Sequence, residues 1–146
     1  MHCTDDQTKF PAELHLMSFT TLGDERGALV ALEGERSVPF DIKRVYYIYA
    51  TLPGVARGFH AHKRLKQVLI AVSGSVSIHC EYGSKKEVIV LDSPGKGLYI
   101  EGMVWHEMHD FTPDCVLLVL ASEHYDEADY VRDYDRFKNI MCHEDF

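Results

Sequence analysis

The arrangement of short apolar and alternating runs between turn-forming residues constrains the fold of this chain more than any other feature. The runs are rich in β-branched and aromatic residues and are bounded by glycine, proline and acidic residues, which is the pattern of β-strands. They are ELHLMSFT, GALVALEGE, IKRVYYIYA, RGFHAH, KQVLIAVSGS, SVSIHCEYG, KEVIVLDSPG, KGLYIEGMVWHEMHDF and DCVLLVLASEHY. Gly74 and Gly83 separate successive runs and predict hairpin turns.

Helical periodicity is confined to the C-terminal segment DEADYVRDYDRFKNIM, residues 126–141. Apolar residues recur there at every third position from Ala128 to Phe137, and Asp126 is suited to cap the start. Roughly ten strands and one terminal helix predict an all-β fold, a small jelly-roll sandwich or barrel, in which residues 1–146 form a single domain. We expect the helix to serve packing and not chemistry.

Charge and composition exclude several kinds of partner. The formal net charge is -8, which gives no general attraction to nucleic acid or to anionic membranes. The longest apolar run, CVLLVLA, is far shorter than the ~20 residues that span a bilayer, and the N-terminus lacks the pattern of a signal peptide. The four cysteines form no CxxC pair, so we expect reduced thiols in a cytoplasmic protein without a nucleic-acid or membrane partner.

Two histidines in the run RGFHAH, His60 and His62, are the first candidates for chemistry. Side chains two residues apart on a strand project from the same face, and His106 in VWHEMHDF is a candidate to meet them across a barrel. Three interpretations stay open at this point. The pair belongs to a metal site, or it performs acid–base catalysis near neutral pH, or it lies exposed on an edge strand, since short motifs often occur by chance.

The metal interpretation follows from a resemblance to the cupin superfamily, in which a His-x-His strand, a nearby carboxylate and a later histidine hold the ion. Gln67 occupies the position where metal-binding cupins usually carry glutamate, and a neutral amide is a weaker ligand for a hard divalent cation. Lys63, Arg64 and Lys66 add positive charge beside the pair. Both features argue against a bound metal.

Longer stretches resemble one family within that superfamily, the WxcM-like sugar 3,4-ketoisomerases, which act on dTDP-4-dehydro-6-deoxyglucose. The resemblance runs from about Phe19 to Phe137. It is carried by DERGALVALE, PFDIKRVYYIY, RGFHAHKRLKQVLIAVSGS, SPGKGLYI, VWHEMHDF and VLLVLASEHYDEADYVRDYDRF. It implies a small cupin jelly roll that forms a homodimer, works without metal or other cofactor, and binds a dTDP-linked 4-keto-6-deoxyhexose.

The reaction that the resemblance implies moves a carbonyl from C4 to C3 of the sugar through an enediol. A base removes the C3 proton, protons shift between O3 and O4, and C4 is then reprotonated, which requires a base, a donor and groups that stabilise enediolate charge. The family's catalytic pair corresponds to His60 and His62. We expect His60 to be the base at C3 and His62 to be its partner, as proton donor or orienting group.

The resemblance also suggests residues that bind the nucleotide and the sugar. They are Arg26, Arg44, Tyr46, Arg57, Lys63, Gln67, Tyr99, Trp105, His106 and Glu107. Arginine forks suit a pyrophosphate, and tyrosines can stack on thymine or donate hydrogen bonds to sugar oxygens. Arg44 and Tyr46 share one strand face, which is consistent with one pocket, and the residues around His106 are expected to form a second pocket wall. For each residue the alternative is a solvated charge or a packing position.

The pair Arg26-Gly27 resembles the branch of the family whose 3-keto product is a 6-deoxygalactose, which feeds a 3-amino-3,6-dideoxygalactose for surface polysaccharide; the other branch forms the gluco epimer. Two further functions stay open. One is an epimerase-like cupin acting at C3 and C5 of the same substrate, although the histidine–aspartate pairing of that family is not found in the sequence. The other is a cupin that binds a sugar nucleotide without catalysis.

Overall fold

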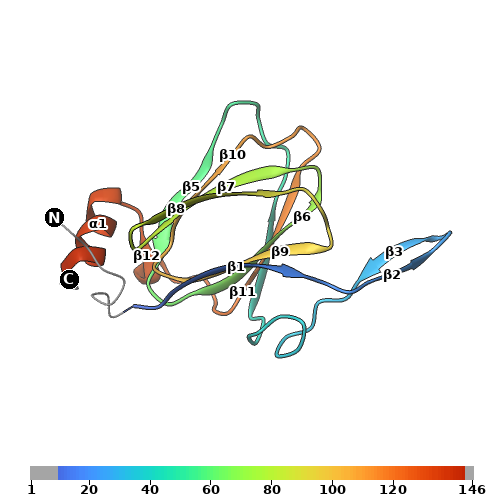
Figure 1. Ribbon diagram of the computed structural model, residues 1–146, viewed down its shortest axis with the longest axis horizontal. Helices are drawn as coiled ribbons and strands as arrows, with labels where there is room; N and C mark the ends of the chain where they lie inside the picture. The colour runs from blue at the N-terminus through green and yellow to red at the C-terminus, as the bar shows by residue number, and fades with distance from the viewer. Residues whose placement is uncertain (1–9, 144–146) are drawn as a thin grey trace.

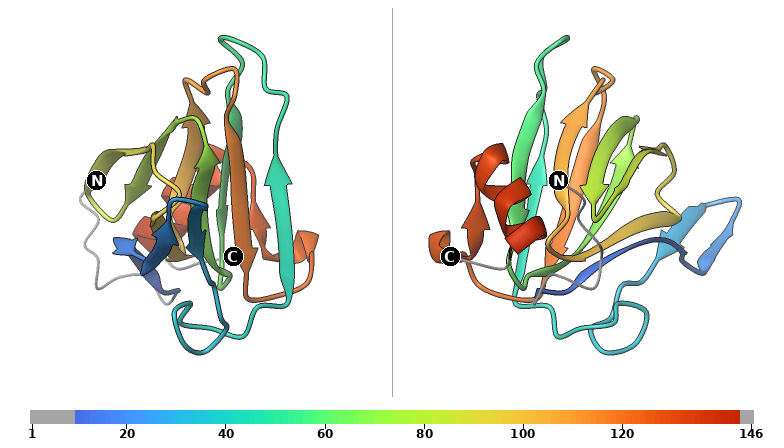
Figure 2. Two further views of the ribbon diagram at one scale, coloured as in Figure 1. Left: turned by 90° about the vertical axis from the view of Figure 1, so that its right-hand side faces the viewer. Right: turned by 60° about the vertical axis from the view of Figure 1, so that its left-hand side comes forward.

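The computed structural model describes residues 10–143, which form two five-stranded antiparallel sheets lying face to face, a projecting hairpin and one α-helix (Figures 1 and 2). The first sheet has the order β1 (Ala12–Ser18), β9 (Lys96–Gly102), β6 (Lys66–Ser73), β11 (Val116–Ala121), β4 (Arg44–Ile48). The second has the order β12 (Tyr130–Val131), β5 (Arg57–His62), β10 (Trp105–His109), β7 (Val76–Tyr82), β8 (Lys85–Leu91). Most paired strands are not consecutive in sequence, as in jelly rolls, and the sheets do not close into a barrel. The predicted all-β jelly-roll class is confirmed.

The main core lies between the sheets, and β6 is buried on both of its faces. Leu69 belongs to the cluster between the sheets, whereas Val68 and Ile70 pack with Val38 and Phe40 from the segment before β4. Full burial of one such aliphatic side chain contributes about 1.5–3 kcal/mol. Because β6 is covered on both sides, its sequence is a continuous apolar run and not an alternating one.

The two glycine turns have different roles. Gly83, with φ +55°, lies in the hairpin between β7 and β8, as predicted. Gly74, with φ +66°, connects β6 to β7, which lie in different sheets, so the prediction of a hairpin there is wrong. A Cβ at Gly74 would lie 2.7 Å from the Cα of Cys115, and this close approach explains the glycine.

The C-terminal segment departs from the predicted helix over residues 126–141. A short 3₁₀ turn, η2 (Glu127–Asp129), is followed by β12, and the helix α1 (Tyr134–His143) begins only after it. The strand β12 pairs with Ala61 and His62 of β5. This tertiary pairing overrides the three-residue periodicity, and it brings polar side chains of the segment next to the histidine strand.

The hairpin of β2 (Thr21–Asp24) and β3 (Gly27–Val30) extends away from the two sheets, at the lower right of Figure 1. It carries two large apolar side chains with high exposure, Leu22 at 59% and Leu29 at 57%. Exposed leucines on a two-stranded ribbon are unusual unless another surface covers them, since such a ribbon alone has little to stabilise it.

The cysteines and the helices bear on two further predictions. Cys80 and Cys115 are free and buried. Cys142 is disulfide-bonded, so the prediction of reduced thiols is wrong at this position. Within the described part of the chain, no helix is long and apolar enough to cross a membrane.

Candidate active site

Three histidines from two neighbouring strands meet on the inner side of the second sheet. His60 and His62 come from β5, and His106 on β10 is directly opposite His60 in the strand pairing. The ring centroid of His60 is 5.0 Å from that of His62 and 4.6 Å from that of His106. His62 and His106 are each 1% exposed. The structure therefore rejects the interpretation of an exposed pair on an edge strand.

An irregularity at the start of β5 orients this cluster. Gly58 and Phe59 both have positive φ, +94° and +61°, next to a register shift between β5 and β10. A Cβ at Gly58 would lie 3.0 Å from the carbonyl oxygen of His106, so glycine allows the strands to approach. For Phe59 the left-handed conformation costs on the order of 1–3 kcal/mol, a strain that proteins retain mainly at functional sites.

Burial keeps two of the imidazoles in their neutral form. Desolvation, with a smaller effect from His62, lowers the pKa of His60 to about 4. Desolvation also holds the pKa of His106 well below its usual value, and the neighbouring histidines act in the same direction. At neutral pH both rings are therefore uncharged and able to accept a proton.

His62 is oriented by a carboxylate from the C-terminal segment. Its Nδ1 lies 3.1 Å from Oδ2 of Asp129, and Oδ1 of Asp129 accepts a hydrogen bond from the backbone N–H of Arg64 at 3.0 Å. Burial raises the pKa of Asp129, but these hydrogen bonds outweigh it and the pKa lies below its usual value. The ionised carboxylate accepts the Nδ1 proton of His62. Nε2 of this ring is buried and has no hydrogen-bond partner within the described residues.

His106 is fixed in a similar way. Its Nδ1 donates to the backbone carbonyl of Val104 at 3.0 Å, which leaves Nε2 as the acceptor. The amide nitrogen of Gln67, on β6 of the opposite sheet, lies 3.5 Å from that Nε2. Gln67 therefore lies beside the histidine cluster, and its predicted role in binding the substrate stays a prediction.

A cavity of about 340 Å³ opens onto His60 and is rich in arginine and tyrosine. Its lining consists of Arg44, Tyr46, Ile48, Arg57, Gly58, His60, Met108, Tyr125, Tyr130 and Arg132. The predicted residues Arg44, Tyr46 and Arg57 are brought together here. Three guanidinium groups around one cavity provide the charge and the donors that a diphosphate requires.

Two tyrosines and an ion pair shape this cavity. Burial, followed by the neighbouring Tyr130, raises the pKa of Tyr46 to about 12, so its phenol keeps the proton and remains a donor. The guanidinium carbon of Arg132 lies 4.2 Å from the centroid of the Tyr130 ring. Two nitrogens of Arg132 donate to the carboxylate of Glu127 at 2.7 and 2.9 Å, which holds the side chain at the cavity.

Five predicted residues lie outside both this cavity and the histidine cluster. Arg26 is in the turn of the projecting hairpin, beyond the last strand pair Asp24–Gly27, and forms an ion pair with Asp24. Tyr99 is buried among apolar residues of the first sheet, and Lys63 follows β5 without lining the cavity. Trp105 and Glu107 face the opposite side of the second sheet from His106, because successive residues of a strand point to opposite faces.

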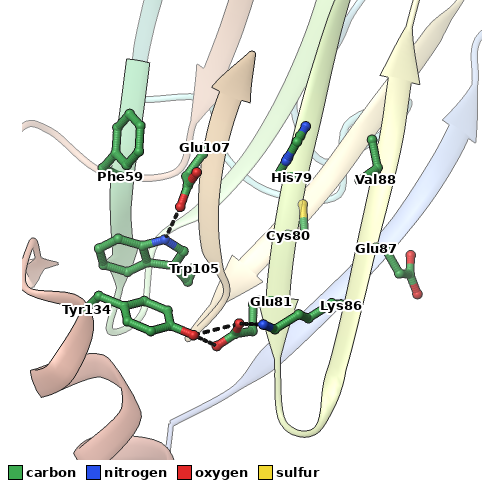
Figure 3. Close-up of a pocket in the computed structure, with 10 residues that line it drawn as sticks. All are labelled: Phe59, His79, Cys80, Glu81, Lys86, Glu87, Val88, Trp105, Glu107 and Tyr134. Carbon is green, nitrogen blue, oxygen red and sulfur yellow. Dashed lines mark hydrogen bonds and ion pairs between the residues drawn. The ribbon is translucent and has the colours of Figure 1, made fainter. Parts of the chain in front are cut away.

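Trp105 and Glu107 line a separate cavity of about 470 Å³ on the outer face of the second sheet, seen in Figure 3. Nε1 of Trp105 donates to Glu107 at 2.9 Å, and the hydroxyl of Tyr134 on α1 donates to Glu81 at 2.7 Å. This side of β10 therefore joins the helix to the sheet, and only His106 of the predicted second wall faces the cluster.

Sequence reasoning missed four polar residues of the site: Tyr125, Asp129, Tyr130 and Arg132. They all lie in or just before the segment that was assigned to a packing helix. The adjacent pair Tyr130-Val131, aromatic and β-branched, is a weak strand signal that distinguishes this segment from the helix. Its pairing with β5 is a tertiary contact, which the local pattern does not contain.

Comparison with protein families places these features in a known group. A family model described as FdtA, WxcM-like, C-terminal matches residues 12–142. A curated protein of Aneurinibacillus thermoaerophilus, named TDP-4-oxo-6-deoxy-alpha-D-glucose-3,4-oxoisomerase, is 52% identical over 130 residues, which cover 89% of this chain and 94% of that protein.

Solved structures give the same result. QdtA, a sugar 3,4-ketoisomerase from Thermoanaerobacterium thermosaccharolyticum in complex with TDP, has a TM-score of 0.86 and 48% identity, covering 88% of this chain and 93% of its own. WlaRB, a TDP-quinovose 3,4-ketoisomerase from Campylobacter jejuni, has a TM-score of 0.82 and 49% identity, covering 85% of this chain and 95% of its own.

Proposed function

The chain belongs to the FdtA, WxcM-like C-terminal family, and from this premise we propose how its histidine cluster acts. The protein is an isomerase that moves the carbonyl of dTDP-4-dehydro-6-deoxy-D-glucose from C4 to C3. The observation that carries the mechanism is the neutral, half-buried His60 in the lining of an arginine-rich cavity. A neutral imidazole in contact with that cavity is a base that can reach a sugar whose diphosphate lies among the arginines.

His60 removes the proton from C3, which the adjacent C4 carbonyl acidifies. The electron pair of the C3–H bond forms the C3–C4 double bond, and the negative charge moves to O4. Protonation of O4 gives the enediol, loss of the O3 proton forms the new carbonyl at C3, and C4 takes up a proton. His62, held by Asp129 through Nδ1, presents Nε2 on the same side and exchanges protons with the sugar oxygens.

The cavity supplies binding and charge stabilisation. Arg44 and Arg57, together with Arg132, bind the diphosphate of the nucleotide. Tyr46 keeps its phenolic proton because its pKa is raised to about 12, so it donates a hydrogen bond to the enediolate oxygen as charge develops. The ion pair with Glu127 holds Arg132 at the cavity before the substrate arrives, which reduces reorganisation during the reaction.

The functional unit that we propose is a homodimer formed through the projecting hairpin. Leu22 and Leu29 are exposed on this hairpin and would be covered by a second copy. Arg26 lies between them in sequence, outside the cavity of its own chain. Its predicted role at the nucleotide therefore requires that the hairpin of one copy reach the cavity of another. With Arg26 in that role, the product is the 6-deoxygalactose 3-keto sugar that the Arg26-Gly27 pair indicates.

The test is incubation with dTDP-4-dehydro-6-deoxyglucose in deuterated water, followed by proton NMR. Loss of the C3 proton and appearance of a 3-keto sugar labelled at C4 are expected, and the couplings of the C4 proton in ordinary water assign its configuration. His60→Asn should abolish the exchange while TDP binding persists. The matched control is His79→Asn, which changes a histidine on the outer face of the sheet.

Other outcomes distinguish the alternative functions. Exchange at both C3 and C5 would identify an epimerase. Absence of exchange with TDP still bound would leave a binding protein and would remove the catalytic role of His60. Full activity of His60→Asn would assign the base to another group.

A further inference from the structure

The cavity of about 470 Å³ on the outer face of the second sheet takes no part in the proposed isomerisation. Side chains of β5, β10, β7 and β8 line it, and Tyr134 of α1 lies beside them (Figure 3). Its size is within the range of about 300–1,000 Å³ that is usual for small-molecule sites. We propose that this cavity binds an organic ammonium ion with an apolar body, and that the bound ion slows the isomerase. The binding is independent of the proposed function, whereas the effect on the rate rests on it.

Large apolar side chains around the cavity leave much of their surface open to a ligand. Phe59 is 43% exposed, Val88 is 61% exposed and Tyr134 is 39% exposed. Exposed apolar side chains that gather at one place mark binding surfaces, whereas single ones are common. The two aromatic rings can also attract a cation to their faces. This part of the cavity therefore suits a ligand that has a hydrocarbon body and a positive charge.

The charged side chains of the cavity favour a cation over an anion. Three carboxylates line it, those of Glu81, Glu87 and Glu107, together with one ammonium group, that of Lys86. Glu81 is already paired with Lys86 and Lys138, each at 3.3 Å. Among the described residues, neither Glu87 nor Glu107 forms an ion pair with a lysine or an arginine. These two carboxylates leave a negative potential at the cavity, which attracts a cationic ligand.

Glu107 is oriented and ionised before a ligand arrives. Nε1 of Trp105 donates to its Oε2 at 2.9 Å, and Nε2 of His109 lies 2.8 Å from its Oε1. Burial raises the pKa of Glu107, but these hydrogen bonds outweigh it and the pKa lies below its usual value. A carboxylate has about four lone-pair sites, so Glu107 can still accept a hydrogen bond from an ammonium group.

The cavity is built on the same two strands as the histidine cluster. Phe59 precedes His60 on β5, and Trp105 and Glu107 flank His106 on β10. Phe59 has φ +61° and lies next to the register shift between β5 and β10. Backbone strain of this kind persists only where the surrounding structure fixes it, so a ligand that packs on Phe59 also displaces His60. Because a misplacement of about 1 Å can cost about 100-fold in rate, the bound ion should lower kcat.

The experiment titrates the protein with phenethylammonium and, as an anion of similar size, with hydrocinnamate. Backbone amide resonances are followed by NMR, with saturating TDP present to fill the nucleotide cavity. We expect phenethylammonium to bind with a Kd of about 1 mM, as suits a ligand of so few atoms, and hydrocinnamate to bind at least about 10-fold more weakly. The resonances that shift should belong to the strands that line the outer cavity.

Val88→Arg should abolish this binding, because it places a cation in the cavity at an exposed position of β8. The matched control is Val90→Arg, which lies on the same face of β8, is 55% exposed and does not line the cavity. Glu87→Gln should weaken the binding about threefold, as expected for the loss of a solvent-exposed charge pair. Thermal unfolding of each variant checks that it is folded.

In the isomerase assay, saturating phenethylammonium should lower kcat at least about twofold, and folded Val88→Arg should keep its full rate in the presence of the cation. Equal affinity for the anion, unchanged binding of the cation by Val88→Arg, or no binding at tens of millimolar would overturn the site. A saturated cavity with unchanged kcat would overturn the effect on the rate. A chain that binds the cation as expected but does not isomerise the sugar would refute the proposed function and leave the site established.

Discussion

Asp129→Asn tests how strongly the C-terminal segment acts on the histidine cluster. The substitution would keep the shape of the side chain and an oxygen for the backbone N–H of Arg64, but it would remove the charge that accepts the Nδ1 proton of His62. The His62 side chain is 2% exposed and that of Asp129 is 21% exposed, so solvent screens this hydrogen bond little. Hydrogen bonds to charged groups contribute about 1.5–3 kcal/mol, which corresponds to about a 10- to 150-fold loss of kcat.

The assay is steady-state isomerisation followed by NMR, together with TDP affinity measured by calorimetry. We expect kcat to fall, the affinity for TDP to stay within about twofold of the wild type, and the pH profile to shift, because the preferred tautomer of His62 changes. A merely structural role for Asp129 would lower the melting temperature without changing the pH profile.

The matched control is Asp126→Asn, on the same segment. Its carboxylate caps the 3₁₀ turn by accepting a hydrogen bond from the N–H of Ala128 at 3.1 Å, away from the hydrogen bond between Asp129 and His62. If Asp129→Asn keeps nearly full kcat, or if both variants lose it equally, the orienting role of Asp129 is refuted.

Three other predictions follow from the site and the hairpin. Because burial lowers the pKa of His60 to about 4, kcat/KM should be constant near neutrality and fall only as the pH drops toward 4. The free energy of unfolding should also decline from about pH 6.5 downward, since the unfolded chain binds the proton more readily there. A fall of kcat/KM near pH 6.5 in folded protein would contradict this assignment. Arg44→Ala and Arg57→Ala should each weaken TDP binding about 10-fold or more, through loss of a hydrogen bond of about 1.5–3 kcal/mol to a charged group, and unchanged calorimetric affinity would remove them from the nucleotide site. Leu22→Asp combined with Leu29→Asp should convert a dimer into a monomer by light scattering, and a wild-type monomer would refute the proposed assembly.

The sequence by itself determined the fold class and the position of the histidine pair. Strand patterns depend on local alternation and turn residues, and the 60–62 spacing places two imidazoles on one face wherever the strand lies. Local patterns also indicated the terminal helix, although its start was predicted eight residues too early, at residue 126 and not at Tyr134. Six longer stretches read together, one of them around His60 and His62, carried the resemblance to the family that the comparisons confirm.

Only the tertiary structure decided which residues accompany the pair. Strand pairing places His106 opposite His60, and it turns Trp105 to the other side of the sheet. The pairing of β12 with β5 joins segments far apart in the sequence and brings Asp129 to His62. The lowered pKa values of His60 and His106 also come from the tertiary structure, because desolvation depends on what covers a side chain and not on its sequence neighbours.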